Sequence, residues 1–100
     1  MAVGLILQFD DTGRDVYEAV NARLNIDPVS GQGDWPPGLL SHVGGTREGG
    51  KLIVIEIWES KDAQGRFMQE RLGRALAEGG VTAQPQITWF DVIANHTPGR

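Results

Sequence analysis

The sequence contains no cysteine among its 100 residues. This absence excludes disulfide bonds, thiolate nucleophiles and thiolate metal sites, and it fits a reducing compartment. The sequence also lacks an apolar run long enough to span a bilayer, and the strand-like AVGLILQF after Met1 has neither the basic start nor the cleavage site of a secretion signal. We therefore expect a cytoplasmic protein that is not inserted in a membrane.

Positive charge and histidine are scarce as well. Nine Lys and Arg against thirteen Asp and Glu give a formal net charge of -4, so neither nucleic acid nor an anionic membrane is a favoured partner. His42 and His96 are far apart and have no metal-ligand spacing. The glycine-rich stretches GQGDWPPG and GGTREGGK lack the spacing of a nucleotide-binding loop and indicate turns. We expect neither a metal nor a cofactor.

What the chain does contain is a regular alternation of strand and helix patterns. Its length and its 40% apolar residues predict one domain, residues 1–100. Ser60 is expected to cap the second helix, and side-chain oxygens of residues 10–12 the first. The predicted elements are a strand at 2–9, a helix at 13–25, a loop at 26–38, strands at 39–45 and 51–59, a helix at 61–78 and a strand at 85–95.

This βαββαβ order predicts an α+β, ferredoxin-like fold with a four-stranded antiparallel sheet and both helices on one face. The first and third strands would be central. GLILQF, LIVIEIW and ITWFDVI are apolar at both alternating sets of positions, yet two helices can cover only one face of a sheet. The other face needs a partner, because a monomer rarely exposes so large an apolar patch. We therefore expect a homodimer that packs sheet on sheet.

The segment IVIEIWESKDAQGRFMQERLGRAL resembles the third strand and second helix of the dimeric α+β-barrel proteins, in particular the antibiotic biosynthesis monooxygenase-like group. The resemblance implies a dimeric barrel and cofactor-free oxygenation of aromatic polyketides. The same superfamily includes haem-degrading enzymes and isomerases. Many members carry a histidine on the second helix where this chain has Phe67, so the resemblance does not extend to haem ligation.

Glu56 lies in the middle of an otherwise apolar strand. Strand alternation places Glu56 on the same face as Val54 and Trp58, where an unpaired carboxylate would be costly. The other strands carry their own polar residues, and these are Gln8, His42 and Asp91, the last beside Trp89. In this fold such groups would line a ligand pocket between sheet and helices. Alternatively, they pair with one another, lie at the dimer interface or reach water near strand ends.

Three further residues are candidates for the same pocket. Arg71 falls within the apolar arc of the second helix, and we expect its guanidinium to pair with Glu56, the alternative being a side chain that only covers the edge of the arc. Tyr17 shares the buried stripe of the first helix, where its hydroxyl could bind a ligand or simply reach water. Trp35 in the loop would close one end of the pocket, or pack on the surface of its own protomer.

These residues suggest proton removal from a carbon or oxygen acid. A histidine such as His42 can deprotonate an acidic phenol or enol carbon, although it could equally be an edge-strand histidine bonded to its neighbours. Our hypothesis is a cofactor-independent monooxygenase acting on an aromatic or polyketide-like molecule through an enolate or phenolate. The alternatives are a non-oxidative isomerase or cyclase, or a non-catalytic dimeric binding module. The candidate catalytic residues are His42, Arg71 and Glu56, and the candidate substrate-binding residues are Gln8, Tyr17, Trp35, Trp58, Phe67, Trp89 and Asp91.

Overall fold

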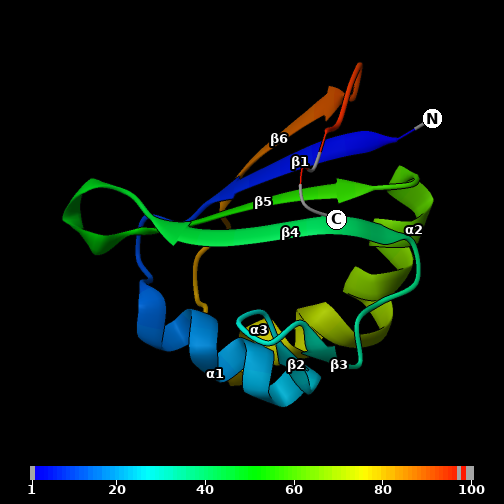
Figure 1. Ribbon diagram of the computed structural model, residues 1–100. Coiled ribbons are helices and arrows are strands. Elements are labelled where there is room, and N and C mark those ends of the chain that lie inside the picture. The colour runs from blue at the N-terminus through cyan, green and yellow to red at the C-terminus, as the bar shows by residue number, and fades with distance from the viewer. Residues whose placement is uncertain (1, 97, 99–100) are drawn as a thin grey trace.

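The computed structural model describes residues 2–96 and 98. Four strands form one antiparallel sheet in the order β4-β5-β1-β6. These strands are β1 (Val3–Gln8), β4 (Leu39–Thr46), β5 (Leu52–Trp58) and β6 (Gln86–Asp91). The predicted α+β fold and the central place of the first and third predicted strands, β1 and β5, are confirmed. Figure 1 shows the helices together on one side of this sheet.

The covered face of the sheet forms the core with the helices. Leu5 and Leu7 of β1 and Val54 and Trp58 of β5 are buried there, because alternate side chains of each strand point to the same face. The helix α1 (Arg14–Leu24) contributes buried Val20 and Leu24. None of the helices in the described chain is both long and apolar enough to span a membrane.

The second predicted helix is interrupted by a wider turn. α2 (Lys61–Phe67) begins after Ser60, whose hydroxyl accepts a hydrogen bond from Ala63 N at 3.1 Å, so the predicted cap is confirmed. A π-helical turn, η2 (Met68–Leu72), follows, and α3 (Gly73–Glu78) completes the helix. The Gly73 N–H donates to the Met68 carbonyl five residues earlier. This wider turn changes the direction of the side chains that follow Phe67 relative to an uninterrupted α-helix.

Three details differ from the prediction. The helix α1 is preceded by Gly13 and has no side-chain cap, because the side chains of residues 10–12 do not bond to its first turn. The predicted loop 26–38 contains a small two-stranded ladder of β2 (Ile26–Asp27) and β3 (Gln32–Gly33). The last strand ends at Asp91 rather than at residue 95. A short 3-10 turn, η1 (Glu48–Gly50), joins β4 to β5.

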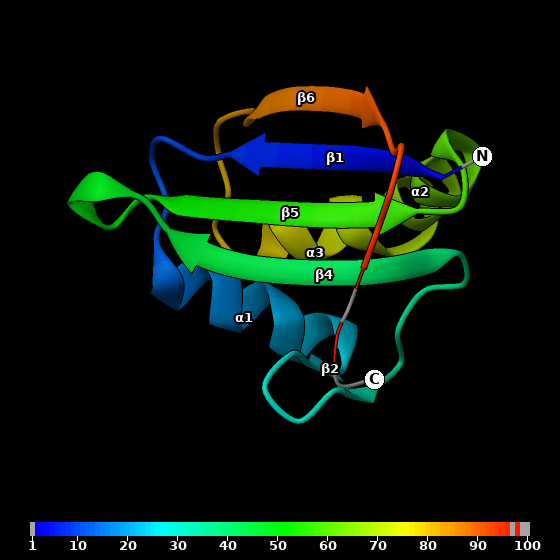
Figure 2. The ribbon, with the colours of Figure 1, turned by 45° about the horizontal axis from the view of Figure 1, so that its top comes forward.

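The other face of the sheet is open in this chain, and Figure 2 looks onto it with the helices behind. Ile53, Ile55 and Ile57 of β5 point to this face, since they alternate with the buried residues. Neighbouring strands add Val43 and Phe90, which are 56% and 42% exposed, and Ile55 itself is 38% exposed. The apolar character of both faces is therefore as predicted.

Candidate functional site

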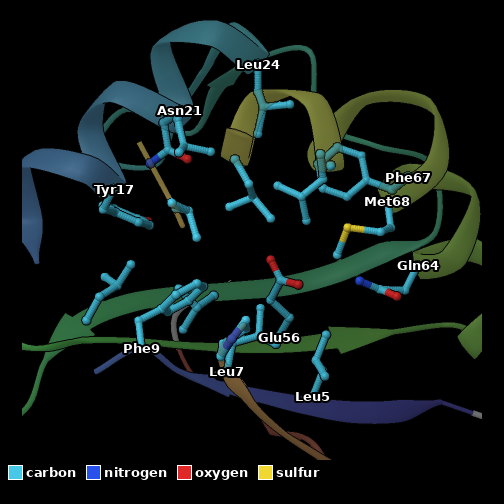
Figure 3. Close-up of a pocket in the computed structure, with 18 of the residues that line it drawn as sticks. Leu5, Leu7, Phe9, Tyr17, Asn21, Leu24, Glu56, Gln64, Phe67 and Met68 are labelled. Carbon is cyan, nitrogen blue, oxygen red and sulfur yellow. The ribbon is translucent and has the colours of Figure 1, made fainter. Parts of the chain in front are cut away.

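A cavity of about 540 Å³ lies between the covered face of the sheet and the helices, and Figure 3 shows its interior. Its walls are mostly apolar, which is typical of small-molecule sites of this size. The polar side chains that line it are Tyr17, Asn21, His42, Glu56, Gln64, Thr82 and Gln84. In Figure 3 the Glu56 carboxylate points from β5 into the cavity, towards the helices.

Both oxygens of the buried Glu56 carboxylate have a hydrogen-bond partner. The Trp58 indole N–H donates to Oε1 at 3.0 Å, and His42 Nδ1 lies 2.7 Å from Oε2. The antiparallel register places His42 directly opposite Glu56, and Trp58 follows two residues later on the same face. The His42 and Glu56 side chains are only 9% and 8% exposed. These two bonds offset the cost of burying the carboxylate.

Tyr17 extends this chain of hydrogen bonds to the helix α1. Its hydroxyl lies 2.6 Å from His42 Nε2, and the two rings stack with their planes 9° apart. Burial raises the pKa of Tyr17 above its ordinary value of 10.0, a hydrogen bond with Asn21 lowers it, and the Glu56 charge raises it. Tyr17 therefore stays protonated near neutral pH, and its proton is available to Nε2 of a neutral His42. In that tautomer His42 carries its own proton on Nδ1 and donates it to Glu56.

Tyr17, His42 and Glu56 thus form a hydrogen-bonded series, here called the acid–base relay, in the cavity wall. Both ring nitrogens of His42 are engaged, so a ligand in the cavity meets the relay at the Tyr17 oxygen. A proton can pass from a ligand to Tyr17 while the Tyr17 proton passes to His42. Glu56 would then stabilise the imidazolium that forms, as the carboxylate does in a catalytic triad.

The predicted ion pair between Arg71 and Glu56 is wrong. The Arg71 guanidinium donates to the Leu24 carbonyl at 2.7 Å and lies 5.4 Å from the centroid of the Phe67 ring. Arg71 belongs to η2, and the wider turn directs it to the end of α1 rather than to β5. Among the described residues that line the cavity there is no lysine or arginine. A cation from Arg71 is therefore not available to hold an anion in the cavity.

The remaining predicted site residues divide into two groups. Trp35, Phe67 and Trp89 line the cavity, and the Trp35 ring lies 5.5 Å from the His42 ring, centroid to centroid. The closing motion of Trp35 stays a prediction. Trp58 is fully buried and contacts the site through Glu56 and Phe67.

Gln8 and Asp91 do not join the cavity. Gln8 lies opposite Ile53 in the β1–β5 register and shares the open face, while Asp91 is exposed at the end of β6. For Gln8 the alternation within the strand was readable, but the side to which the helices pack was not. Asp91 has the parity of the covered face, opposite Val3, and stays outside the cavity because β6 ends there. No group of three or more potential metal ligands occurs in the part of the chain that the structure describes.

Four polar residues of the cavity were missed as site residues from the sequence, and two of them, Asn21 and Gln64, are buried. Asn21 is buried one helical turn after Tyr17, and its side chain lowers the pKa of the phenol. Gln64 is buried in the first turns of α2, across the cavity from Tyr17 in Figure 3. The available signal was helical spacing, because residues four apart share one face of a helix.

No family model matches the sequence, and no curated protein matches it either. Several solved structures do match the chain. A protein from Chloroflexus aurantiacus J-10-fl with the provisional name antibiotic biosynthesis monooxygenase is 19% identical, with a TM-score of 0.70 over 99% of this chain and 100% of that one. The chain has the antibiotic biosynthesis monooxygenase (ABM) fold.

Two oxygenases share this ABM fold. SnoaB, a cofactor-independent oxygenase from Streptomyces nogalater, is 16% identical with a TM-score of 0.57, over 99% of this chain and 98% of that one. The monooxygenase from the gene ActVA-Orf6 of Streptomyces coelicolor, solved with nanaomycin D, is 20% identical with a TM-score of 0.59, over 97% and 91%. At these identities the ABM fold is what the chains have in common. The fold of the single chain expected from the sequence resemblance is confirmed, and the dimeric barrel stays a prediction.

Proposed function

We propose that this protein is a cofactor-independent monooxygenase-like enzyme that removes a proton from an aromatic or polyketide-like small molecule. The observation that carries the proposal is the acid–base relay of Tyr17, His42 and Glu56 in the wall of an apolar cavity. The oxygenase SnoaB and the nanaomycin D complex of ActVA-Orf6, both of the same fold, support it. The cavity volume of about 540 Å³ suits a ligand of a few fused rings.

The relay explains how an anion could form without a cation in the cavity. Proton transfer through Tyr17 converts neutral His42 to an imidazolium, which contacts the Glu56 carboxylate and is separated from the substrate anion by the Tyr17 phenol. The positive charge thus arises next to Glu56 and one residue away from the anion, and charge separation across the apolar cavity stays small. Trp58 holds the second carboxylate oxygen and keeps Glu56 aligned with His42. The amides of Asn21 and Gln64 supply further hydrogen bonds to ligand oxygens.

The resulting carbanion or phenolate can then react with molecular oxygen. For an anthrone, the methylene carbon loses two hydrogens and gains one oxygen atom, giving anthraquinone and one water from one dioxygen. The carbon is oxidised, and dioxygen is the only oxidant that the balance needs. The non-oxidative alternative uses the same relay, which returns the proton to a different carbon. In the binding-module alternative the relay acts only as a hydrogen-bonded wall.

Measurements with anthrone as the test substrate distinguish the oxygenase from the non-oxidative enzyme and from the binding module. Under anaerobic conditions in D₂O, enzyme-dependent exchange of the methylene protons reports proton removal, and in air an oxygen electrode reports oxygenation. We expect both, and we expect Tyr17→Phe and His42→Gln to lower both rates by roughly 100-fold or more. Exchange without oxygen uptake would support the isomerase or cyclase instead. Binding by calorimetry without either reaction would support the binding module.

We also propose that the protein works as a homodimer that pairs the open sheet faces. Support comes from the exposed Val43, Ile55 and Phe90 on one continuous face, since a monomer rarely leaves such a patch uncovered. A cytoplasmic location stays a prediction that the absence of cysteine favours. That residues 1–100 form one domain likewise stays a prediction.

A further inference from the structure

Gly44 of β4 lies directly beneath the ring of Tyr17. A Cβ atom at this glycine would come within 2.4 Å of both Cζ and the hydroxyl oxygen of Tyr17, and within 2.9 Å of Cε1. These distances are far shorter than any real carbon contact, so no side chain fits there while the phenol keeps its place. His42, two residues earlier on the same face of β4, is the hydrogen-bond partner of the Tyr17 hydroxyl.

The backbone of β4 gives no other reason for a glycine at this point. Gly44 is absent from the glycines with positive φ in the described chain, so any residue could adopt its conformation. A glycine inside a strand weakens the strand, and such a residue often marks a close approach of another group. Here the approaching group is the Tyr17 ring. Gly45, the next residue, differs in this respect, because a Cβ there would meet only Ile53 Cγ2 at 3.8 Å.

Tyr17 and His42 also separate the cavity from a second hollow. This outer groove of about 670 Å³ lies between α1 and β4. The two hollows have in common the residues Tyr17, Asn21, Ile26, His42 and Leu52. These five residues, the phenol and the imidazole among them, therefore form the wall between the cavity and the groove. The groove carries the charged residues Arg14, Glu18 and Asp27, and Arg14 is paired with Glu18 at 3.1 Å.

We infer that Gly44 is a positioning residue of the acid–base relay, because the space left by its missing side chain holds the Tyr17 phenol against His42 and closes the cavity towards the outer groove. A methyl group at residue 44 displaces the ring from this place and separates the hydroxyl from Nε2. The inference rests on the proposed function for its catalytic meaning. The position of the phenol can be measured without any substrate.

Tyr17 is the only tyrosine in the sequence, so the alkaline absorbance change at the tyrosinate band reports this residue alone. We expect Gly44→Ala to shift the transition, because the displaced phenol no longer has the burial and the neighbours, His42 and Glu56, that set its pKa in the parent protein. The groups that face it are His42 from β4 and Glu56 from β5, with Asn21 on its own helix. Gly45→Ala, the matched control, should titrate like the parent protein. Identical transitions in Gly44→Ala and the parent would overturn the inference.

A double-mutant cycle separates this local clash from general damage to the strand. Gly44→Ala should lower the melting temperature in the parent protein but have little effect in a Tyr17→Ala background, where no ring occupies the space. Equal losses in both backgrounds would contradict a clash with Tyr17. Far-UV circular dichroism confirms that each variant is folded before it is titrated.

Turnover of anthrone provides the last readout. We expect Gly44→Ala to lower kcat at least tenfold, with Gly45→Ala close to the parent protein. If the parent protein does not turn over anthrone but its tyrosine transition still shifts in Gly44→Ala, the positioning role stands and the proposed function fails. If the parent turns over anthrone and Gly44→Ala leaves both transition and rate unchanged, the positioning role fails and the proposed function stands.

Discussion

At the scale of single residues, the protonation of Tyr17 links the site to stability. Folding raises the pKa of Tyr17 above 10.0, first through burial and also through the Glu56 charge. The neutral phenol therefore contributes stability that is complete below pH 10 and is lost as the pH rises from there through the folded-state pKa. We expect the free energy of unfolding of the parent protein to fall over this range more steeply than that of Tyr17→Phe. Urea denaturation at a series of pH values measures both curves, and parallel curves would contradict a raised pKa.

The charge of Glu56 can be tested at the same scale. Glu56→Gln keeps the shape of the side chain but removes the negative charge that disfavours tyrosinate, so the pKa of Tyr17 should fall. Glu59→Gln is the matched control, because Glu59 is exposed after the end of β5. The absorbance titration of the single tyrosine measures the effect. A transition in Glu56→Gln at or above that of the parent would show that the carboxylate does not act on the phenol.

At the scale of elements, Arg71 links the π-helical turn η2 to the end of α1. Its guanidinium bonds the Leu24 carbonyl at the end of α1, one of the carbonyls that a helix leaves without an internal partner. Arg71→Ala should therefore cost about 2 kcal/mol of the free energy of unfolding in urea denaturation. Arg74→Ala, which removes an exposed pair with Glu78, should cost less than roughly 0.5 kcal/mol.

The same residue tests the corrected partner of Glu56. Arg71 bonds the Leu24 carbonyl, whereas Glu56 bonds His42 and Trp58, so the effects of Arg71→Ala and Glu56→Gln on unfolding should add. Agreement of the sum with the double variant within about 0.5 kcal/mol is expected for sites without shared partners. A larger coupling energy would show that Arg71 and Glu56 interact, as the sequence predicted.

At the scale of the whole molecule, the main feature is the open face of the sheet, which is apolar and exposed in the single chain. A charge at Ile55, in the middle of that face, should convert the proposed homodimer to monomers, because it would be buried without a partner in a sheet-on-sheet interface. Val29→Glu is the control, since Val29 is 97% exposed in the segment between β2 and β3. Light scattering at micromolar concentration should give a dimer for the parent and Val29→Glu but a monomer for Ile55→Glu. A folded parent monomer would contradict the proposal.

The sequence by itself determined the element order, the faces of the strands and the burial of Glu56. These follow from local periodicity, since alternation along β5 is independent of what packs against it. The Ser60 cap is local in the same way, and its hydrogen bond forms within one turn. The residues of the relay were all among the candidates, but the sequence did not show which of them are in contact.

Only the tertiary structure decided the partner of Glu56. The β4–β5 register, set by pairing between residues distant in the chain, brings His42 opposite the carboxylate. The π-helical turn at Met68–Leu72 redirects Arg71, and no periodicity in the sequence marks that turn. The space above Gly44 exists because α1 crosses β4 at the point where Tyr17 projects. Each of these depends on packing between elements, to which a pattern within one element is insensitive.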